Sequence, residues 1–224
     1  MEKGSIKILG EGFISSGEYE NIKIMGSSKS KGNVKSNEVK VLGDAKFEGD
    51  INIKNFVVNG KTIIRGNLKA ERVRVNGQLN IEGDAEIDDL VITAQQKVDG
   101  KLKCNNVTIR GQLSVNECDG LLNGENIYVY SGGGSYCKEI GATNIKIGRS
   151  KDAFSLIKII NIFSGKFKCN LIEGDTIELE DASIKDIRGK SISLVDNCDV
   201  GNIEYSDNLS VSDNSTVKNS IKVG

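Results

Sequence analysis

The amino-acid sequence predicts an all-β fold in which the chain winds as a three-sided parallel β-helix, with about 17 residues per coil and about 13 coils. Three observations lead to this prediction. Apolar residues recur in pairs separated by one residue, the pairs repeat at an interval of 17 residues, and glycine recurs between them. The 224 residues include 26 glycines and no proline, so the chain turns often while every backbone N–H stays available for pairing between strands.

The first apolar pair of each repeat is the most regular. Its leading position is occupied by Ile22, Val39, Phe56, Val73, Leu90 and Val107, and a second apolar residue follows two positions later in each repeat. Residues two apart point to the same face of a strand, whereas on a helix they lie about 200° apart. These pairs therefore predict strands that each turn one face to the core.

Two further pairs complete the repeat, and each follows a glycine. The repeat that begins at residue 73 shows them as Leu79 with Ile81, after Gly77, and Ala85 with Ile87, after Gly83. Glycine at the first two corners admits positive φ and tight bending, and polar residues occupy the third corner. The strands of one coil find hydrogen-bond partners only in the coils above and below, so the coils must stack.

The second half of the sequence keeps this pattern with looser spacing. The leading column begins with Ile6 and continues beyond residue 107 at Ile127, Ile145, Ile160, Ile177, Ile192 and Leu209. We expect one β-helix domain over residues 1–224. A longer step and the run "SGGGS" predict an irregular loop or a register break near residues 118–150, and the run over 152–163 is too uniformly apolar for its facing to be assigned.

The composition argues against several classes of function. Lysine and arginine number 30 against 31 aspartates and glutamates, with the signs interspersed, and this balance does not favour nucleic acid as a partner. The sequence contains no histidine, the commonest general base and metal ligand. The five cysteines show no CxxC spacing, so they predict neither a disulfide framework nor a zinc site. We expect no catalytic residues, no metal and no cofactor.

No segment of the sequence indicates export or insertion into a membrane. A span needs about 20 consecutive apolar residues and a signal peptide needs an apolar core of about 7 to 15 residues. Neither is found in the chain. We therefore expect a cytoplasmic protein, and membrane association is not indicated by the sequence.

Two kinds of triangular solenoid compete for this pattern. The left-handed hexapeptide helix of acyltransferases places an aliphatic residue immediately before its glycine and uses a histidine as catalytic base. Here the aliphatic residue stands two positions before the glycine, as in "VLG", "VNG" and "IRG", and histidine is absent. A left- or right-handed β-helix enzyme that acts on sugars or acyl groups stays as the alternative hypothesis.

The repeat resembles that of bactofilins, the polymer-forming bacterial cytoskeletal proteins. The resemblance is carried by "VKVLGDAKFEGDINI", "VVNGKTIIRGNLKAERVRVNGQLNIEGDAEI" and "VTIRGQLSV", and it is clearest over residues 20–117. The length of the repeat region is similar to that of the long members from Gram-positive bacteria. The resemblance implies a right-handed β-helix that polymerises end to end, without nucleotide, into non-polar filaments. Such filaments scaffold cell-shape, envelope or motility machinery, so the implied partners are the chain itself, a co-polymerising paralogue and proteins of that machinery.

The two ends of the predicted β-helix are the candidate functional sites. Soluble β-solenoids commonly cover their terminal strands with a helix or a charged loop, and neither cap is visible in the sequence. Exposed core side chains beside open strand edges predict stacking of further copies. The expected N-terminal interface consists of Ile6, Ile8, Phe13 and Tyr19. The expected C-terminal interface consists of Leu209, Val211, Val217, Ile221 and Val223. If each end meets its own kind, both joints are isologous.

Overall fold

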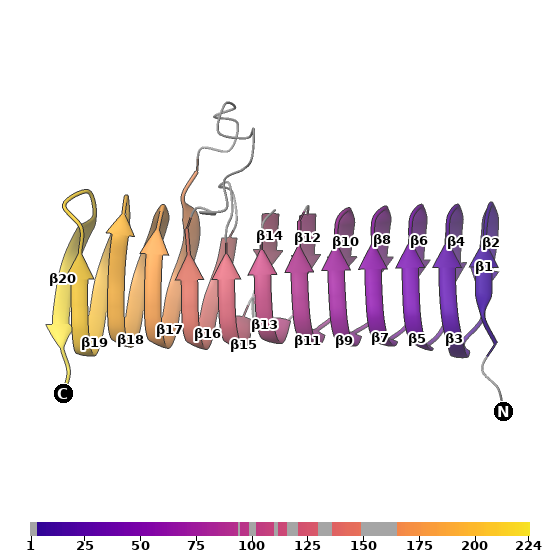
Figure 1. Ribbon diagram of the computed structural model, residues 1–224, viewed down its shortest axis with the longest axis horizontal. Helices are drawn as coiled ribbons and strands as arrows, with labels where there is room; N and C mark the ends of the chain where they lie inside the picture. Colours follow the sequence, from indigo (N-terminus) through magenta and orange to yellow (C-terminus); the bar gives the residue numbers. More distant parts are fainter. Residues whose placement is uncertain are drawn as a thin grey trace.

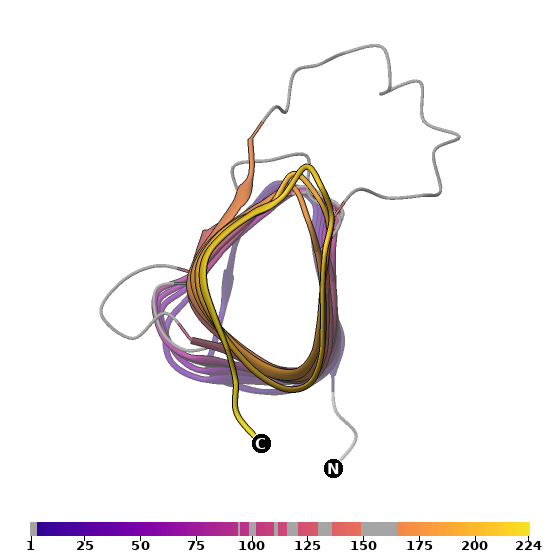
Figure 2. The ribbon, with the colours of Figure 1, turned by 90° about the vertical axis from the view of Figure 1, so that its left-hand side faces the viewer.

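The three apolar pairs of a repeat predict three short strands per coil. In the N-terminal half, two of these pairs lie on one long strand that continues through the polar corner, so each coil has one long and one short strand. Residues 4–93, 95–98, 102–109, 112–115, 121–129, 136–148 and 165–224 are described by the computed structural model of the chain. The described strands belong to one 20-stranded parallel sheet. Seen along its axis, the sheet closes into a three-sided rod (Figures 1 and 2). The predicted all-β solenoid is confirmed.

The strands follow the chain in a fixed order. A first strand, β1 (Ile6–Ile8), is followed by alternating short and long strands. The long strands are β3 (Gly17–Ile24), β5 (Val34–Val41), β7 (Ile51–Val58), β9 (Leu68–Val75), β11 (Ala85–Ile92), β13 (Leu102–Ile109) and β15 (Leu121–Val129). The short strands are β2 (Glu11–Ile14), β4 (Ser27–Ser30), β6 (Asp44–Phe47), β8 (Lys61–Ile64), β10 (Gln78–Ile81), β12 (Gln95–Val98) and β14 (Gln112–Val115).

In the C-terminal half the strands continue through the corners. These longer strands are β16 (Tyr136–Ile147), β17 (Phe167–Glu180), β18 (Ala182–Asp196), β19 (Asp199–Val211) and β20 (Thr216–Lys222). The register shifts between Leu179 and Glu180, and again between Gly189 and Ser191. Asp181 and Asn197 have φ values of 52° and 50°, so two corners here use non-glycine residues in the left-handed region.

The parallel register confirms the predicted column up to Ile145. Residues in that column pair from Ile6↔Ile22 to Ile127↔Ile145. The prediction that Ile160 forms the next rung is wrong, because Ile145 pairs directly with Ile177. The chain accordingly forms fewer coils than the about 13 predicted. The physical reason is that residues 168–179 place apolar residues opposite those of β16 at several positions, including Ile140↔Ile172. Ile160 was assigned only from its distance along the sequence to the neighbouring members of the column.

Within residues 118–150, β15 and β16 stay in the ladder. Val107 pairs with Ile127, which accounts for the longer step of 20 residues, and Ile127 pairs with Ile145. Residues 118–120, 130–135 and 149–150 of this stretch, and the apolar run over 152–163, lie outside the described residues.

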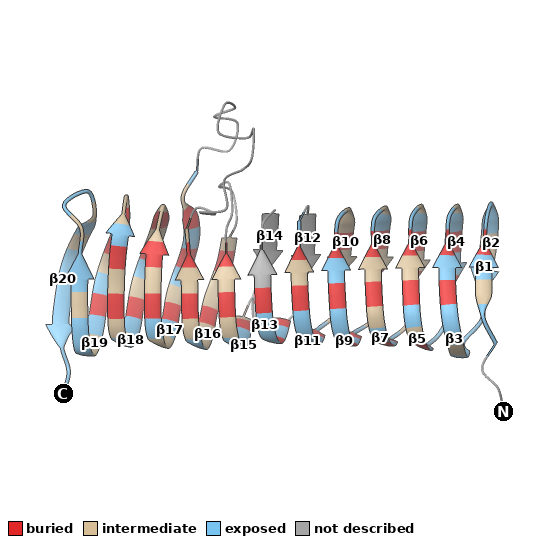
Figure 3. Cartoon of the chain, viewed as in Figure 1, coloured by how far each residue is buried: buried red, intermediate tan, exposed pale blue. Residues whose placement is uncertain are grey.

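The core is a set of buried columns that run along the rod. In Figure 3 the buried residues form bands at matching heights on successive strands. Along β7 and β9, buried and exposed residues alternate, and two successive residues at the corner stay outside the core. Phe56 is buried between Val39 and Val73 in the same column. Alternation and register together give each coil a closed apolar interior.

The corner glycines are required for a reason that differs from the predicted one. Gly43, Gly60 and Gly77 do not have positive φ; among the described glycines, Gly17 and Gly32 do. A Cβ on Gly60 would instead lie 2.0 Å from the carbonyl oxygen of Gly43 in the preceding coil. Real Cβ atoms do not approach backbone oxygens so closely. Glycine at this corner therefore permits the close stacking of one turn on the next.

Buried cysteines are part of the core columns. Cys104, Cys137, Cys169 and Cys198 are buried and free, whereas Cys118 lies outside the described residues. Burial raises the pKa of the Cys137 thiol to about 12. Burial also raises the pKa of the Cys104 and Cys169 thiols. Cys137 and Cys169 occupy neighbouring rungs as small apolar residues.

We expect the Cys137 thiol to resist alkylation in the folded protein. With a pKa of about 12 instead of 9.0, its thiolate is about a thousandfold less populated at pH 8. Iodoacetamide labelling followed by peptide mass spectrometry measures the modification at each cysteine. Labelling in urea provides the reference rate. Native labelling of Cys137 at that reference rate would contradict its placement in the core.

Candidate assembly interfaces at the ends of the β-helix

The N-terminal coil pairs with the rest of the rod along one edge only. Its strands β1 and β2 pair with β3 and β4, and the start of β3 pairs with Val34–Ser36. Within the described residues, no strand pairs with their outer edge. The outer edge therefore presents backbone N–H and C=O groups of parallel strands along the rod axis.

Three of the four predicted N-terminal residues continue core columns. Ile6 and Ile8 pair in register with Ile22 and Ile24, and Ile6 is half-buried because no further rung covers it. Tyr19 lies opposite Ser36, whose side chain points inward. The Tyr19 hydroxyl donates a hydrogen bond to the Ser15 carbonyl oxygen at 2.8 Å. The Tyr19 ring thus packs against the core at the end of the rod.

Phe13 faces outward and does not continue a core column. It lies opposite Lys29 and is 56% exposed. The Ile14 side chain points inward instead, and Gly12 takes an inward position, where an added Cβ would meet the Ile8 side chain. The sequence held a signal for this facing. In the repeat, Gly12 and Ile14 align with Ala45 and Phe47, which take the inward positions of β6, so Phe13 aligns with an outward position. That Phe13 takes part in the N-terminal interface stays a prediction.

The C-terminal coil is likewise paired along one edge. Leu209 and Val211 pair with Ile192 and Leu194, and β20 pairs with the first half of β19. No other described strand covers Leu209, Val211 or β20 on the far side. Figure 3 shows most of β20 exposed, and Val217 is its one half-buried residue. This end presents open strand edges in the same way as the N-terminal end.

The predicted C-terminal residues divide into an inward and an outward group. Leu209, Val211 and Val217 continue core columns, and Val217 lies opposite the buried Val200. Ile221 lies opposite Glu204, in the outward column, so its expected core facing is wrong. The cause is the inward position of Ser220, which shifts the alternation of "NSIKV" by one residue relative to the apolar pattern. Val223 follows the last strand and is exposed.

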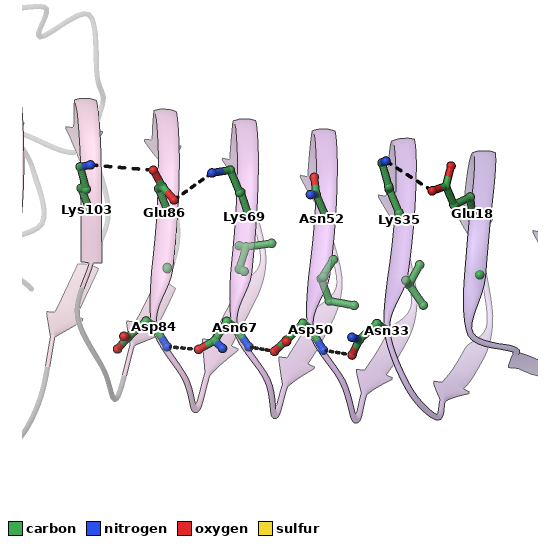
Figure 4. Close-up of a pocket in the computed structure, with 15 residues that line it drawn as sticks. Glu18, Asn33, Lys35, Asp50, Asn52, Asn67, Lys69, Asp84, Glu86 and Lys103 are labelled. Atoms are coloured by element: carbon green, nitrogen blue, oxygen red, sulfur yellow. Dashed lines mark hydrogen bonds and ion pairs between the residues drawn. The ribbon is translucent and has the colours of Figure 1, made fainter.

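A lengthwise groove of about 780 Å³ is the place where an enzyme site would be sought (Figure 4). A ladder at its corner consists of Asn33, Asp50, Asn67 and Asp84. Side-chain oxygens of the first three residues accept hydrogen bonds from the backbone N–H of the next coil at 2.8–2.9 Å. These oxygens hold the corner together, so their first role is structural.

The acidic side chains on the wall of the groove are paired with lysines. Lys69 and Lys103 lie 3.0 and 3.8 Å from the carboxylate of Glu86, and Lys35 lies 3.3 Å from Glu18 (Figure 4). The hydrogen bond from Lys69 lowers the pKa of Glu86. A general acid that cleaves glycosides needs the opposite shift. The shift at Glu86 is thus the reverse of the one that would favour the enzyme hypothesis.

Two further findings concern sites that other classes of protein would show. In the part of the chain that the structure describes, no three His, Cys, Asp or Glu side chains gather as metal ligands would. No helix of that part is long and apolar enough to cross a membrane.

Comparison with known proteins supports the resemblance seen in the repeats. Residues 7–103 match the family model named Bactofilin, described as polymer-forming cytoskeletal. Two uncharacterized Bacillus subtilis (strain 168) proteins, YhbE and YhbF, are 30% and 33% identical to this chain over 105 residues. That alignment covers 46% of the chain and 44% or 42% of the relatives, so less than half the length of either relative is matched. No solved structure matches the chain. The predicted resemblance to bactofilins is confirmed over residues 7–103.

Proposed function

We propose that this chain, whose residues 7–103 match a polymer-forming cytoskeletal family, is a structural protein that self-assembles end to end into filaments. In this proposal the whole of residues 1–224 acts as one β-helical unit in the cytoplasm. The filaments are non-polar, form without nucleotide, and scaffold cell-shape, envelope or motility machinery. The partner at each joint is a second copy or a co-polymerising paralogue.

The observation that carries the proposal is the pair of open coils at the two ends of the rod. Each terminal coil combines unpaired strand edges with apolar side chains that continue core columns, such as Ile6 at one end and Leu209 at the other. Stacking a second coil on either end would pair the backbone groups and cover those side chains at the same time. A parallel solenoid therefore supplies both parts of an assembly interface without a separate binding domain.

The two kinds of joint differ in symmetry. A joint between like ends is isologous, so each contact occurs twice about a two-fold axis, and a rod with two such joints forms a filament without polarity. A head-to-tail joint would instead continue the parallel ladder and give a polar filament. The family match supports polymerisation. We propose the non-polar arrangement, and variants at each end of the rod distinguish it from a head-to-tail filament.

Electron microscopy of the purified full chain tests the proposal. We expect long unbranched filaments by negative stain in buffer that contains EDTA and no nucleotide, because neither end needs a ligand to pair. Sedimentation velocity on the same sample measures the fraction assembled. A monodisperse monomer in both measurements over a wide range of protein concentration would refute self-assembly.

A further inference from the structure

The first three coils carry the same outward pair of side chains on one side of the rod. The sequences "IKIL" (6–9), "IKIM" (22–25) and "VKVL" (39–42) place two apolar residues inward and a lysine, then a leucine or methionine, outward. The outward residues form what is here termed the amphipathic edge: Lys7, Lys23 and Lys40 beside Leu9, Met25 and Leu42. The edge lies along β1, β3 and β5 at the N-terminal end of the rod (Figure 1).

The lysines of the amphipathic edge stack directly on one another. Lys7 pairs in register with Lys23, and Lys23 with Lys40, at the spacing of about 4.8 Å between neighbouring strands. None of the three forms an ion pair with another described residue, and Glu38, the acid two residues before Lys40, does not pair with it either. Like charges directly opposite each other destabilise a sheet.

Two other charged columns of the rod alternate in sign. Glu86 lies between Lys69 and Lys103 and approaches both. Arg188 lies 3.1 Å from Glu173 and 3.3 Å from Glu204, on the coils before and after it. Lys29 and Lys46 also stack, but on two coils only, and Lys46 lies 3.5 Å from Glu48. The row of three lysines has no such partner among the described residues. Anions from outside the chain would relieve its self-repulsion.

The apolar row is confined to the same three coils. The side chains of Leu9, Met25 and Leu42 are 65%, 44% and 41% exposed. The next two coils carry Asn59 and Asn76 at this position, and the Asn76 amide donates a hydrogen bond to the Asn59 side-chain oxygen at 2.8 Å. At this position, therefore, the three coils with stacked lysines carry exposed apolar residues, whereas the next two coils carry asparagines that hydrogen-bond to each other. They stand on an outer corner, so they project from the rod.

We propose that the amphipathic edge docks on a membrane surface rich in anionic phospholipids. The three ammonium groups would donate hydrogen bonds to headgroup phosphates, and the projecting side chains would enter the boundary between headgroups and acyl chains. A second copy is the less suitable occupant, because no column of the described residues stacks acids on three consecutive coils. The contact is peripheral, and its side chains point sideways from the rod, whereas the open edge of β1 faces along the rod axis.

Vesicle flotation with the full chain tests the charge of the edge. The protein is expected to float with phosphatidylglycerol-rich vesicles and to stay behind with phosphatidylcholine vesicles. Each lysine near such a surface contributes about fivefold to binding, so the triple variant Lys7→Gln, Lys23→Gln, Lys40→Gln should bind about a hundredfold more weakly. The control Lys69→Gln, Lys103→Gln, Lys190→Gln makes the same change of charge at ion-paired sites and should float like the parent. Equal flotation of the two triple variants would overturn the proposal.

A second variant tests the apolar row. Leu9→Ser, Met25→Ser, Leu42→Ser should weaken flotation at least tenfold and make the remainder reversible by salt, since the variant loses the methylene groups that would be buried at the acyl-chain boundary. Asn59→Ser, Asn76→Ser is the matched control. Circular dichroism checks folding, and negative-stain microscopy should show unchanged filaments, which separates this site from the assembly interfaces. If the serine variant alters self-association without vesicles and floats normally, the edge is a contact between copies and the proposal is wrong.

Discussion

Val211→Lys should stop growth at the C-terminal end and leave pairs of rods joined through their N-terminal ends. Val211 is part of the last rung on its side and is 41% exposed, so a lysine there adds a charge at the joint and disturbs little of the interior. An isologous joint would bring two such charges together in a contact that must lose water, which costs several kcal/mol. Sedimentation velocity should show a dimer and electron microscopy should show no filaments.

The same experiment at the other end completes the test. Ile6→Lys, on the half-buried first rung, should also give dimers, and the double variant should give monomers. In a head-to-tail filament every joint uses both kinds of end, so each single variant would be a monomer and a mixture of the two would form heterodimers. Ser210→Lys adds the same charge on the outward face of the same strand, because the exposed Ser210 lies between the inward Leu209 and Val211, and it serves as the control. Long filaments in both single variants would show that the ends do not form the joints.

Gly60→Ala is expected to destabilise the rod strongly. The new Cβ would lie 2.0 Å from the Gly43 carbonyl oxygen, so two coils would have to separate locally. Overpacking of this kind costs about 3 kcal/mol. For a chain of this length, that corresponds to a fall in melting temperature of roughly 6–12 °C.

A matched substitution is available at the same corner of the first coil. Gly10 occupies the equivalent position, and a Cβ there meets nothing within 4 Å because no preceding coil covers it. Gly10→Ala should therefore change stability by less than about 0.5 kcal/mol. Circular dichroism melting curves of both variants provide the comparison. Equal melting temperatures would show that stacking distance does not explain the glycine column.

The fold was predictable from the sequence because hydrogen bonds and burial repeat with the same period. Once Val73 and Leu90 occupy one column, the parallel ladder allows no other register without turning apolar residues outward. Prediction failed where apolar content alone was used, as for Ile160, since an apolar run fits any register. Ser28 and Ser30 show the reverse: both are buried at positions that carry apolar residues in other coils, and only the register of their neighbours reveals it.

The end residues were harder to predict than the interior. Each interior strand is constrained by two neighbours, whereas the terminal coils have one neighbour and tolerate a shift of alternation, as at Ser220. Phe13 and Ile221 are apolar residues placed outward by such local choices. The amphipathic edge had a signal in the repeats "IKILG", "IKIMG" and "VKVLG", but that signal is visible only when outward positions are read as columns.

The uniform step between stacked rungs has a consequence for how such proteins change in size. From Ile22 to Val107 each coil pairs with the next in the same register, offset by 17 residues. The coils in this range therefore stack in the same way. An in-frame duplication or loss of one repeat would lengthen or shorten the rod by about 4.8 Å and leave both terminal coils untouched. The number of repeats in the gene thus sets the length of the rod. The spacing between successive joints of a filament would therefore change by one coil at a time.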